Sequence, residues 1–218
     1  MDDSVMSDDP KFCFEEVLST FKVCLTEDKE VILENYVSSW RGLIKFLNSL
    51  GSVFGFISKD ATNKIQILMN LIKGDTHSHY MTAQSMVRYE LDNGLVDIEK
   101  RGSHPESGTR TLLRLHRALR WLELFLERLR TSTEDCKTSA MCAEAYNESL
   151  AHYHPWVVRK AAGLAFIVLP GRPAFFEVMN VGPPEQVVAI LGEAMPLISE
   201  VYQITEDLYA KNNLLDLP

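Results

Sequence analysis

The sequence predicts an all-α protein, and three observations support that fold class. Most segments of the 218 residues place apolar side chains three or four positions apart, which is the spacing of one helix face. No segment of useful length alternates apolar and polar residues as a half-buried strand does. The chain also lacks internal repeats and low-complexity linkers, so we expect one domain over residues 1–218, with 1–10 as a flexible N-terminal segment. About eight helices exceed a simple four-helix bundle, and we expect them to pack as a two-layer helical sandwich.

The first half of the chain is predicted to hold four helices. Apolar periodicity places three of them at 14–25, 35–50 and 79–92. Gly51-Ser52 interrupts the pattern after the second helix, and Ser52 is a suitable N-cap for the helix that follows. That third helix is expected to run to about residue 72 and to stop before Gly74.

The second half is predicted to hold five helices, at 109–130, 134–152, 155–169, 173–179 and from 184 onward. Turn residues mark 103–108 as a loop before the first of these. Pro155 suits the first turn of a helix, where its missing N–H leaves no partner unsatisfied. Pro196 is a candidate kink in the last helix, because proline removes one backbone hydrogen bond.

Composition restricts the function. The 22 basic and 30 acidic residues give a net charge of −8, which argues against general nucleic-acid binding. Positive charge is nevertheless concentrated between residues 100 and 130, a segment that contains eight Lys or Arg but only three Glu. The four cysteines form no CxxC motif and the chain opens on acidic residues, so we expect free thiols in a cytosolic protein. No apolar run reaches the ~20 residues that span a bilayer, so any membrane contact is expected to be peripheral.

Two pairs of charged residues stand on otherwise apolar helix faces. Asp60 and Lys64 are four residues apart, and so are Arg110 and Arg114. Each pair has an ordinary alternative, an ion pair within one helix for the first and arginines that reach out to solvent for the second. Like charges at this spacing destabilise a helix unless an anion lies between them. Taken together, the pairs predict a site for an anionic group beside an apolar space.

Other polar patterns in the sequence do not indicate a metal site or a catalytic site. The histidine pairs at 77 and 79 and at 152 and 154 have a spacing that suits metal ligation poorly on a helix, and no acidic or cysteine cluster completes them, so we expect no metal. Phosphate-cradling, nucleophile-elbow and dinucleotide-binding motifs are absent, so neither a cofactor nor an enzyme is expected.

Trp156 either packs in the core or is an exposed membrane anchor, since an indole suits the membrane–water interface. Trp40 has the same two interpretations and is the second candidate for membrane docking.

Several long stretches resemble the glycolipid transfer protein family, and more closely its branch that carries ceramide 1-phosphate. They are Phe46-Leu47-Asn48-Ser49-Leu50-Gly51, Phe56-Ile57-Ser58-Lys59-Asp60, Arg110-Thr111-Leu112-Leu113-Arg114-Leu115-His116-Arg117-Ala118-Leu119, Tyr153-His154-Pro155-Trp156-Val157-Val158-Arg159 and Leu214-Leu215-Asp216-Leu217-Pro218. The resemblance covers nearly the whole chain, and motifs of this length in this order are specific.

The resemblance implies a helical sandwich that holds both lipid chains between its layers. It assigns the sphingoid amide N–H to Asp60 and the amide carbonyl to His154. The glycolipid branch has Asn where this chain has Lys64 and a sugar-stacking Trp where it has Arg114. The implied phosphate-binding residues are therefore Lys64, Arg110, Arg114 and, in the preceding loop, Arg101.

The implied function is non-enzymatic transfer of ceramide 1-phosphate between membranes. The protein is then expected to be a cytosolic monomer that associates transiently with membranes, the Golgi and plasma membrane by resemblance. Two alternatives stay open. One is a lipid sensor of the same fold that signals through a protein partner. The other is a phospholipid-acting enzyme with His154 as general base, for which the sequence offers neither a nucleophile nor a metal.

Overall fold

A computed structural model describes residues 12–51, 54–97, 104 and 106–218. The described residues form α-helices and short 3-10 helices, with isolated β-bridges but no β-sheet, which confirms the all-α fold class. The elements are α1 (Phe14–Lys22), α2 (Leu33–Ser49), α3 (Gly55–Lys73), η2 (His77–His79), α4 (Ala83–Asp92), α5 (Gly108–Thr131), α6 (Thr138–Glu148), η3 (Ala151–Tyr153), α7 (Trp156–Ile167), α8 (Arg172–Met179) and α9 (Pro184–Lys211).

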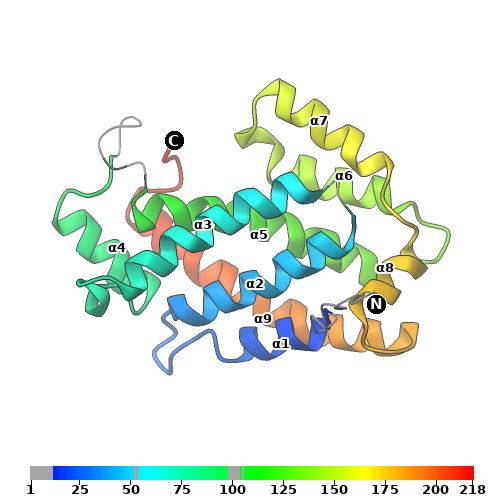
Figure 1. The fold of residues 1–218 in the computed structure, drawn as a ribbon, viewed down its shortest axis with the longest axis horizontal. Coiled ribbons are helices and arrows are strands. Elements are labelled where there is room, and N and C mark those ends of the chain that lie inside the picture. The colour runs from blue at the N-terminus through cyan, green and yellow to red at the C-terminus, as the bar shows by residue number, and fades with distance from the viewer. Residues whose placement is uncertain (1–11, 52–53, 98–103, 105) are drawn as a thin grey trace, which may run out of the picture.

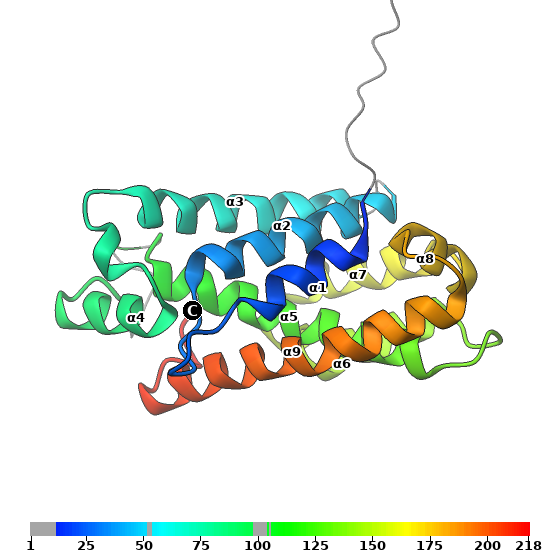
Figure 2. The same cartoon turned by 90° about the horizontal axis from the view of Figure 1, so that it is seen from below.

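The helices are arranged in two layers (Figures 1 and 2). Helices α1, α2 and α3 pack side by side in one layer, and α6, α5 and α9 form the other. The layers meet where α3 packs on α5 and α1 packs on α9. Helix α4 lies against α5 at one end of the molecule, whereas α7 and α8 lie at the other end, on α6 and α9. Helix α5 therefore packs against α6 and α9 in its own layer and against α3 in the other layer.

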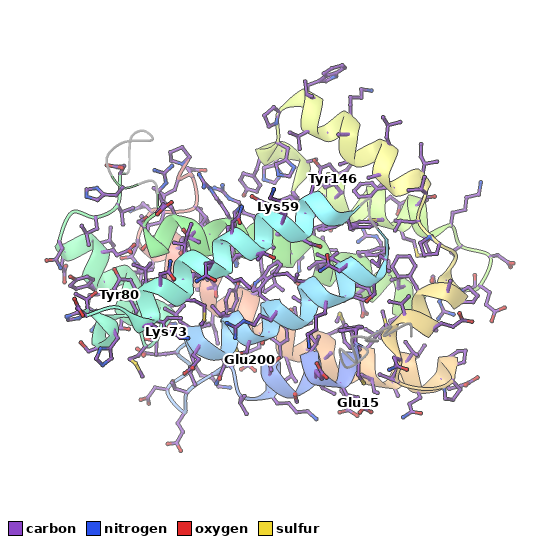
Figure 3. The ribbon with its side chains drawn as sticks, in the orientation of Figure 1. Glu15, Lys59, Lys73, Tyr80, Tyr146 and Glu200 are labelled. Carbon is purple, nitrogen blue, oxygen red and sulfur yellow. The ribbon has the colours of Figure 1, made fainter. Side chains whose placement is uncertain are left out.

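The central position of α5 explains its unusual sequence. It buries side chains on nearly every side, including the polar Thr109, Arg110, Thr111 and His116. Charged residues of the outer helices, such as Glu15, Lys59 and Lys73, are exposed instead (Figure 3). Burying a charged side chain is unfavourable unless it finds partners. The partners of the α5 charges are therefore what defines the candidate site.

Two predicted helices had boundaries that were wrong by more than a turn. The helix predicted from residue 79 begins at Ala83, because Thr82 and Ser85 form a reciprocal capping box that fixes the start. The helix predicted over 134–152 is limited to Thr138–Glu148, followed by the 3-10 turn η3. Both errors extend a helix into a neighbouring 3-10 helix or turn.

Among the unbroken helices of the described residues, α9 alone is long and apolar enough to cross a membrane. Its most apolar window of 18 residues has a mean hydropathy of 1.4, and 39% of that window is buried in the protein. The bent pair α7 and α8, with 91° between its helices, passes the same test. Helix α9 packs against α5 and α1, as the core helix of a helical sandwich does.

Candidate lipid head-group site

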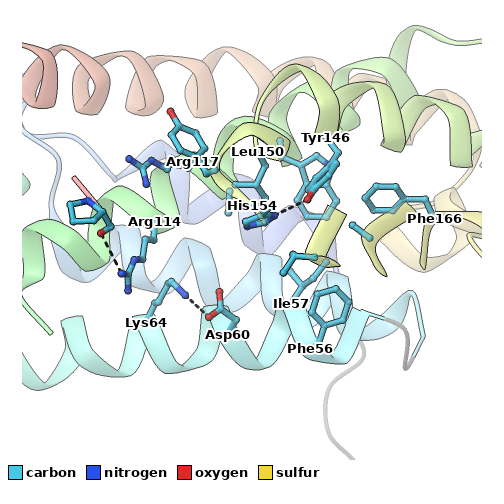
Figure 4. A pocket seen from close by; sticks show the side chains of 16 residues that line it. Phe56, Ile57, Asp60, Lys64, Arg114, Arg117, Tyr146, Leu150, His154 and Phe166 are labelled. Carbon is cyan, nitrogen blue, oxygen red and sulfur yellow. Dashed lines mark hydrogen bonds and ion pairs between the residues drawn. The ribbon is translucent and has the colours of Figure 1, made fainter. Parts of the chain in front are cut away.

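A cavity of about 610 Å³ lies among α3, α5, α6 and α7 (Figure 4). Its lining combines an apolar part with a polar end. The apolar part is formed by Phe56, Ile57, Ala118, Trp121, Leu150, Val158, Ala162 and Phe166. The polar end is formed by Asp60, Lys64, Arg114, Arg117, Tyr146, Tyr153, His154 and Pro218. A second, smaller space of about 30 Å³ extends from Asp60 and Lys64 between α2, α3 and α5.

Asp60 and Lys64 occupy successive turns of α3 and form an ion pair, with Lys64 Nζ 2.5 Å from Asp60 Oδ1. The side chain of Lys64 is 14% exposed, whereas that of Asp60 is 69% exposed. The structure therefore contains the salt bridge within one helix that is the ordinary interpretation of this pair. Both residues also line the cavity, which the ordinary interpretation does not require.

Arg110 is completely buried at the start of α5. Its Nη2 donates to the backbone oxygen of Pro218 at 2.9 Å, and its Nη1 lies 4.0 Å from Asp97 Oδ2. Nε and Nη1 have no hydrogen-bond partner among the described residues. Arg110 does not line the cavity itself; Pro218 does. A buried guanidinium with two unused donors is unfavourable, and an anion that reached it would relieve that cost.

The next two turns of α5 carry Arg114 and Arg117, and both contact the same C-terminal segment. Arg114 Nη2 lies 3.4 Å from the Pro218 oxygen. Arg117 Nη2 donates to the backbone oxygens of Leu215 at 2.6 Å and Leu217 at 3.1 Å, and its guanidinium stacks 3.9 Å above the Tyr153 ring. Burial lowers the pKa of Arg117.

His154 lies just before α7, on the opposite wall of the cavity from α3 (Figure 4). Its Nδ1 is 2.7 Å from the hydroxyl of Tyr146 on α6. Burial lowers the pKa of His154. The negative charge of Asp60 raises this pKa and the positive charge of Lys64 lowers it, and the net shift is downward. Burial also raises the pKa of Tyr146. Both rings are therefore neutral at pH 7, and the histidine offers hydrogen bonding rather than charge.

Glu90, on α4, is a residue that the sequence analysis missed. Its carboxylate is buried and accepts the backbone N–H of Gly108 at 2.7 Å, that of Thr109 at 2.8 Å and the hydroxyl of Tyr80 at 3.2 Å. A carboxylate at a helix N-terminus satisfies free N–H groups and opposes the positive end of the helix dipole. Glu90 thus fixes the turn that carries Arg110. No local signal reveals this cap, because Glu90 precedes the helix by 18 residues.

The two candidate docking residues have different surroundings. Trp156 is 63% exposed at the start of α7. Further apolar side chains are exposed along this helix and at its C-cap, namely Val157, Leu164, Ile167 and Val168. Trp40 is only 1% exposed, so its predicted docking role was wrong. It is buried because α2 is covered by α1 on one side and by α3 on the other. A periodic apolar pattern alone does not distinguish the two environments.

Arg101 lies outside the described residues. Within the described ranges, no group of three or more His, Cys, Asp or Glu side chains is close enough to hold a metal ion. The structure therefore brings together Asp60, Lys64, Arg114 and His154 around one cavity, with Arg110 behind Pro218.

Comparisons with known proteins identify relatives of this chain by sequence and by fold. The family model described as glycolipid transfer protein matches residues 31–181. A ceramide-1-phosphate transfer protein from Danio rerio is 68% identical over 207 residues, which are 95% of this chain and 98% of that protein. The crystal structure of the human ceramide-1-phosphate transfer protein in complex with 2:0 ceramide-1-phosphate is 58% identical, with a TM-score of 0.92 over 95% of this chain and 100% of that chain. The apo form of the mouse protein is 54% identical, with a TM-score of 0.93 over the same shares.

Proposed function

The chain belongs to the glycolipid transfer protein family, and we propose that it transfers ceramide 1-phosphate between membranes. The observation that carries the proposal is the cationic end of the cavity, where Lys64 and Arg114 line the wall and Arg110 lies directly behind. The named relatives are transfer proteins rather than enzymes, and one of them is solved with ceramide 1-phosphate bound. A carrier is therefore favoured over the enzyme that would use His154 as a base.

The proposed head-group contacts follow from charge and hydrogen-bonding capacity. Guanidinium groups bind phosphate oxygens through paired N–H donors, and a lysine adds a point charge. We assign the phosphate to Lys64, Arg110 and Arg114, with Arg101 as a further candidate from the loop before α5. A phosphate that attracts Lys64 weakens its ion pair with Asp60, which leaves the Asp60 carboxylate to accept the amide N–H of the sphingoid base.

His154 is assigned to the amide carbonyl. If the Tyr146 hydroxyl donates to Nδ1, the imidazole proton is on Nε2, and that N–H is available to a carbonyl oxygen. The lipid chains would occupy the apolar part of the cavity and extend between the layers. The chains leave one apolar phase for another, so head-group contacts decide which lipid is selected.

Membrane docking is assigned to Trp156 and the apolar side chains that α7 exposes beside the cavity. An amphipathic indole at the membrane surface and neighbouring aliphatic side chains provide a peripheral, reversible contact. The protein is proposed to act in the cytosol as a monomer and a single domain, with the Golgi and plasma membrane as its membranes.

The experiment is fluorescent or radiolabelled lipid transfer between vesicles. Lys64→Ala and Arg110→Leu should each reduce transfer of ceramide 1-phosphate by about tenfold or more, since each loses a charge-assisted contact. Lys59→Ala is the matched control, because Lys59 is exposed on α3 and does not line the cavity. Folded Lys64→Ala and Arg110→Leu proteins that transfer this lipid at the control rate would contradict the assignment.

A further inference from the structure

The segment that follows α9, residues 212–218, folds back along α5 and is called here the tail. Figure 1 shows the C end of the chain beside the first turns of α5. Two leucines of the tail, Leu214 and Leu217, are buried. The amide of Leu214 donates to the Tyr209 oxygen at 2.9 Å, and the Tyr209 hydroxyl donates to the Thr109 oxygen at 2.6 Å. The tail is thus anchored to the same part of α5 that carries the proposed phosphate ligands.

Three arginines in the first half of α5 contact the tail in two different ways. Arg117 binds the Leu215 and Leu217 oxygens and so holds the anchored part of the tail. Arg110 and Arg114 both reach the Pro218 oxygen, at 2.9 Å and 3.4 Å. These are two of the cations assigned above to the lipid phosphate. In the structure a backbone oxygen of the chain itself therefore accepts their hydrogen bonds.

We propose that Pro218 is an internal competitor of the head group: its oxygen occupies Arg110 and Arg114 while no lipid is bound and is displaced by a phosphomonoester. The inference deepens the proposed function and rests on it, because it assumes that these arginines bind the lipid phosphate. It makes Pro218 a specificity-determining residue, since a lipid must replace the contacts that Pro218 already makes.

The exchange favours an anionic head group over a neutral one. The Pro218 oxygen leaves Nε and Nη1 of the buried Arg110 without hydrogen-bond partners among the described residues, and the Asp97 carboxylate is 4.0 Å from Nη1. A phosphomonoester brings negative charge and several acceptor oxygens, so it can replace the lost contacts and use further donors. A neutral hydroxyl or sugar brings no charge and forms weaker bonds to guanidinium groups. Competition with Pro218 therefore discriminates against neutral sphingolipids and assists release, because the tail can recover its contacts as the phosphate leaves.

Displacement requires only a local movement. Pro218 is exposed, whereas the preceding Leu217 is buried and its oxygen is held by Arg117. A rotation after Leu217 would withdraw the Pro218 oxygen without detaching the rest of the tail. Pro218 also lines the cavity while Arg110 does not, so its movement is what would open the path from the cavity to Arg110.

The test compares the full-length chain with two tail variants, in binding and stopped-flow release of a soluble short-chain ceramide 1-phosphate. One variant lacks Pro218, and the other, Leu217→Ala, loosens the anchor of the tail at unchanged length. Leu197→Ala is the matched control, because Leu197 is a partly buried leucine of α9 outside the tail. Hydrogen exchange of the tail amides is followed with and without the lipid.

Removal of Pro218 should tighten binding about tenfold and slow release, because a charge-assisted competitor is lost. Leu217→Ala should also tighten binding and slow release, whereas the Leu197→Ala control should leave the affinity and the release rate unchanged. In the parent protein, lipid binding should speed hydrogen exchange of the tail amides. Unchanged or weaker binding in both tail variants, with Lys64→Ala still impaired, would overturn the role of Pro218 and leave the proposed function intact. A parent protein that binds no ceramide 1-phosphate would overturn both.

Discussion

Glu90 offers a test of how the fold positions the cationic cluster. Glu90→Gln keeps the size of the side chain but replaces one carboxylate oxygen by an NH₂ group. That group would face a backbone N–H of Gly108 or Thr109, which now donate to the two oxygens at 2.7 and 2.8 Å. One charge-assisted bond is lost and a buried donor is left without a partner, each worth about 1–3 kcal/mol. The favourable interaction with the helix dipole is lost as well, which adds up to ~1 kcal/mol.

Some of this loss is recovered by relaxation and by the remaining bond, so we expect Glu90→Gln to lower the free energy of unfolding by about 3 kcal/mol. Urea unfolding measures it as a lower midpoint at unchanged slope. The matched control is Glu177→Gln, at an exposed position on α8. Lipid binding should weaken too, because Arg110 belongs to the turn that Glu90 fixes. A loss below about 0.5 kcal/mol, the scale of an ordinary surface substitution, would refute the capping role.

Three further predictions concern the cavity wall, the docking helix and pH. Asp60→Val should weaken binding of ceramide 1-phosphate and narrow its preference over phosphatidic acid, which has phosphate but no amide; an undiminished preference would place amide recognition elsewhere. Trp156→Ala should lower vesicle partitioning several-fold while a soluble short-chain lipid still binds. Met81→Ala should leave partitioning unchanged, because it removes an exposed side chain just before α4, the helix at the opposite end of the molecule from α7. The free energy of unfolding should fall as pH drops from 7 towards 5, because burial holds the pKa of His116 and His154 below the ordinary 6.5, so the unfolded chain takes up protons first. His116→Gln should make this slope shallower, and an unchanged slope would contradict the assignment.

Much of the fold could be predicted because apolar side chains recur at helical spacing in each helix. The wrong boundaries lie where a 3-10 helix or a turn adjoins the α-helix, as before Ala83 and before Thr138. The same limit explains Trp40: periodicity shows that a face is apolar but not whether another helix covers it. Trp156 looks similar in sequence and is exposed because α7 lies at the edge of the sandwich.

The charged part of the site was predicted more completely than its support. Asp60, Lys64 and Arg114 stand four residues from a charged partner, which places them on a common helix face whatever the tertiary fold. Glu90 and Pro218 reach the cluster only through tertiary contacts, across 18 and 108 residues of sequence from Gly108 and Arg110 respectively. No local pattern encodes such contacts. The structure is required to see that the chain itself both caps and occupies the cationic site.

The most direct test of the central claim is the rate of transfer between vesicles across a panel of head groups on the same ceramide. The panel compares ceramide 1-phosphate, unmodified ceramide and a neutral glycosphingolipid, with matched acyl chains so that apolar contacts are constant. The cationic cluster predicts fast transfer of ceramide 1-phosphate and transfer of the two neutral lipids slower by at least about tenfold. Equal or faster transfer of the neutral glycosphingolipid would contradict the account.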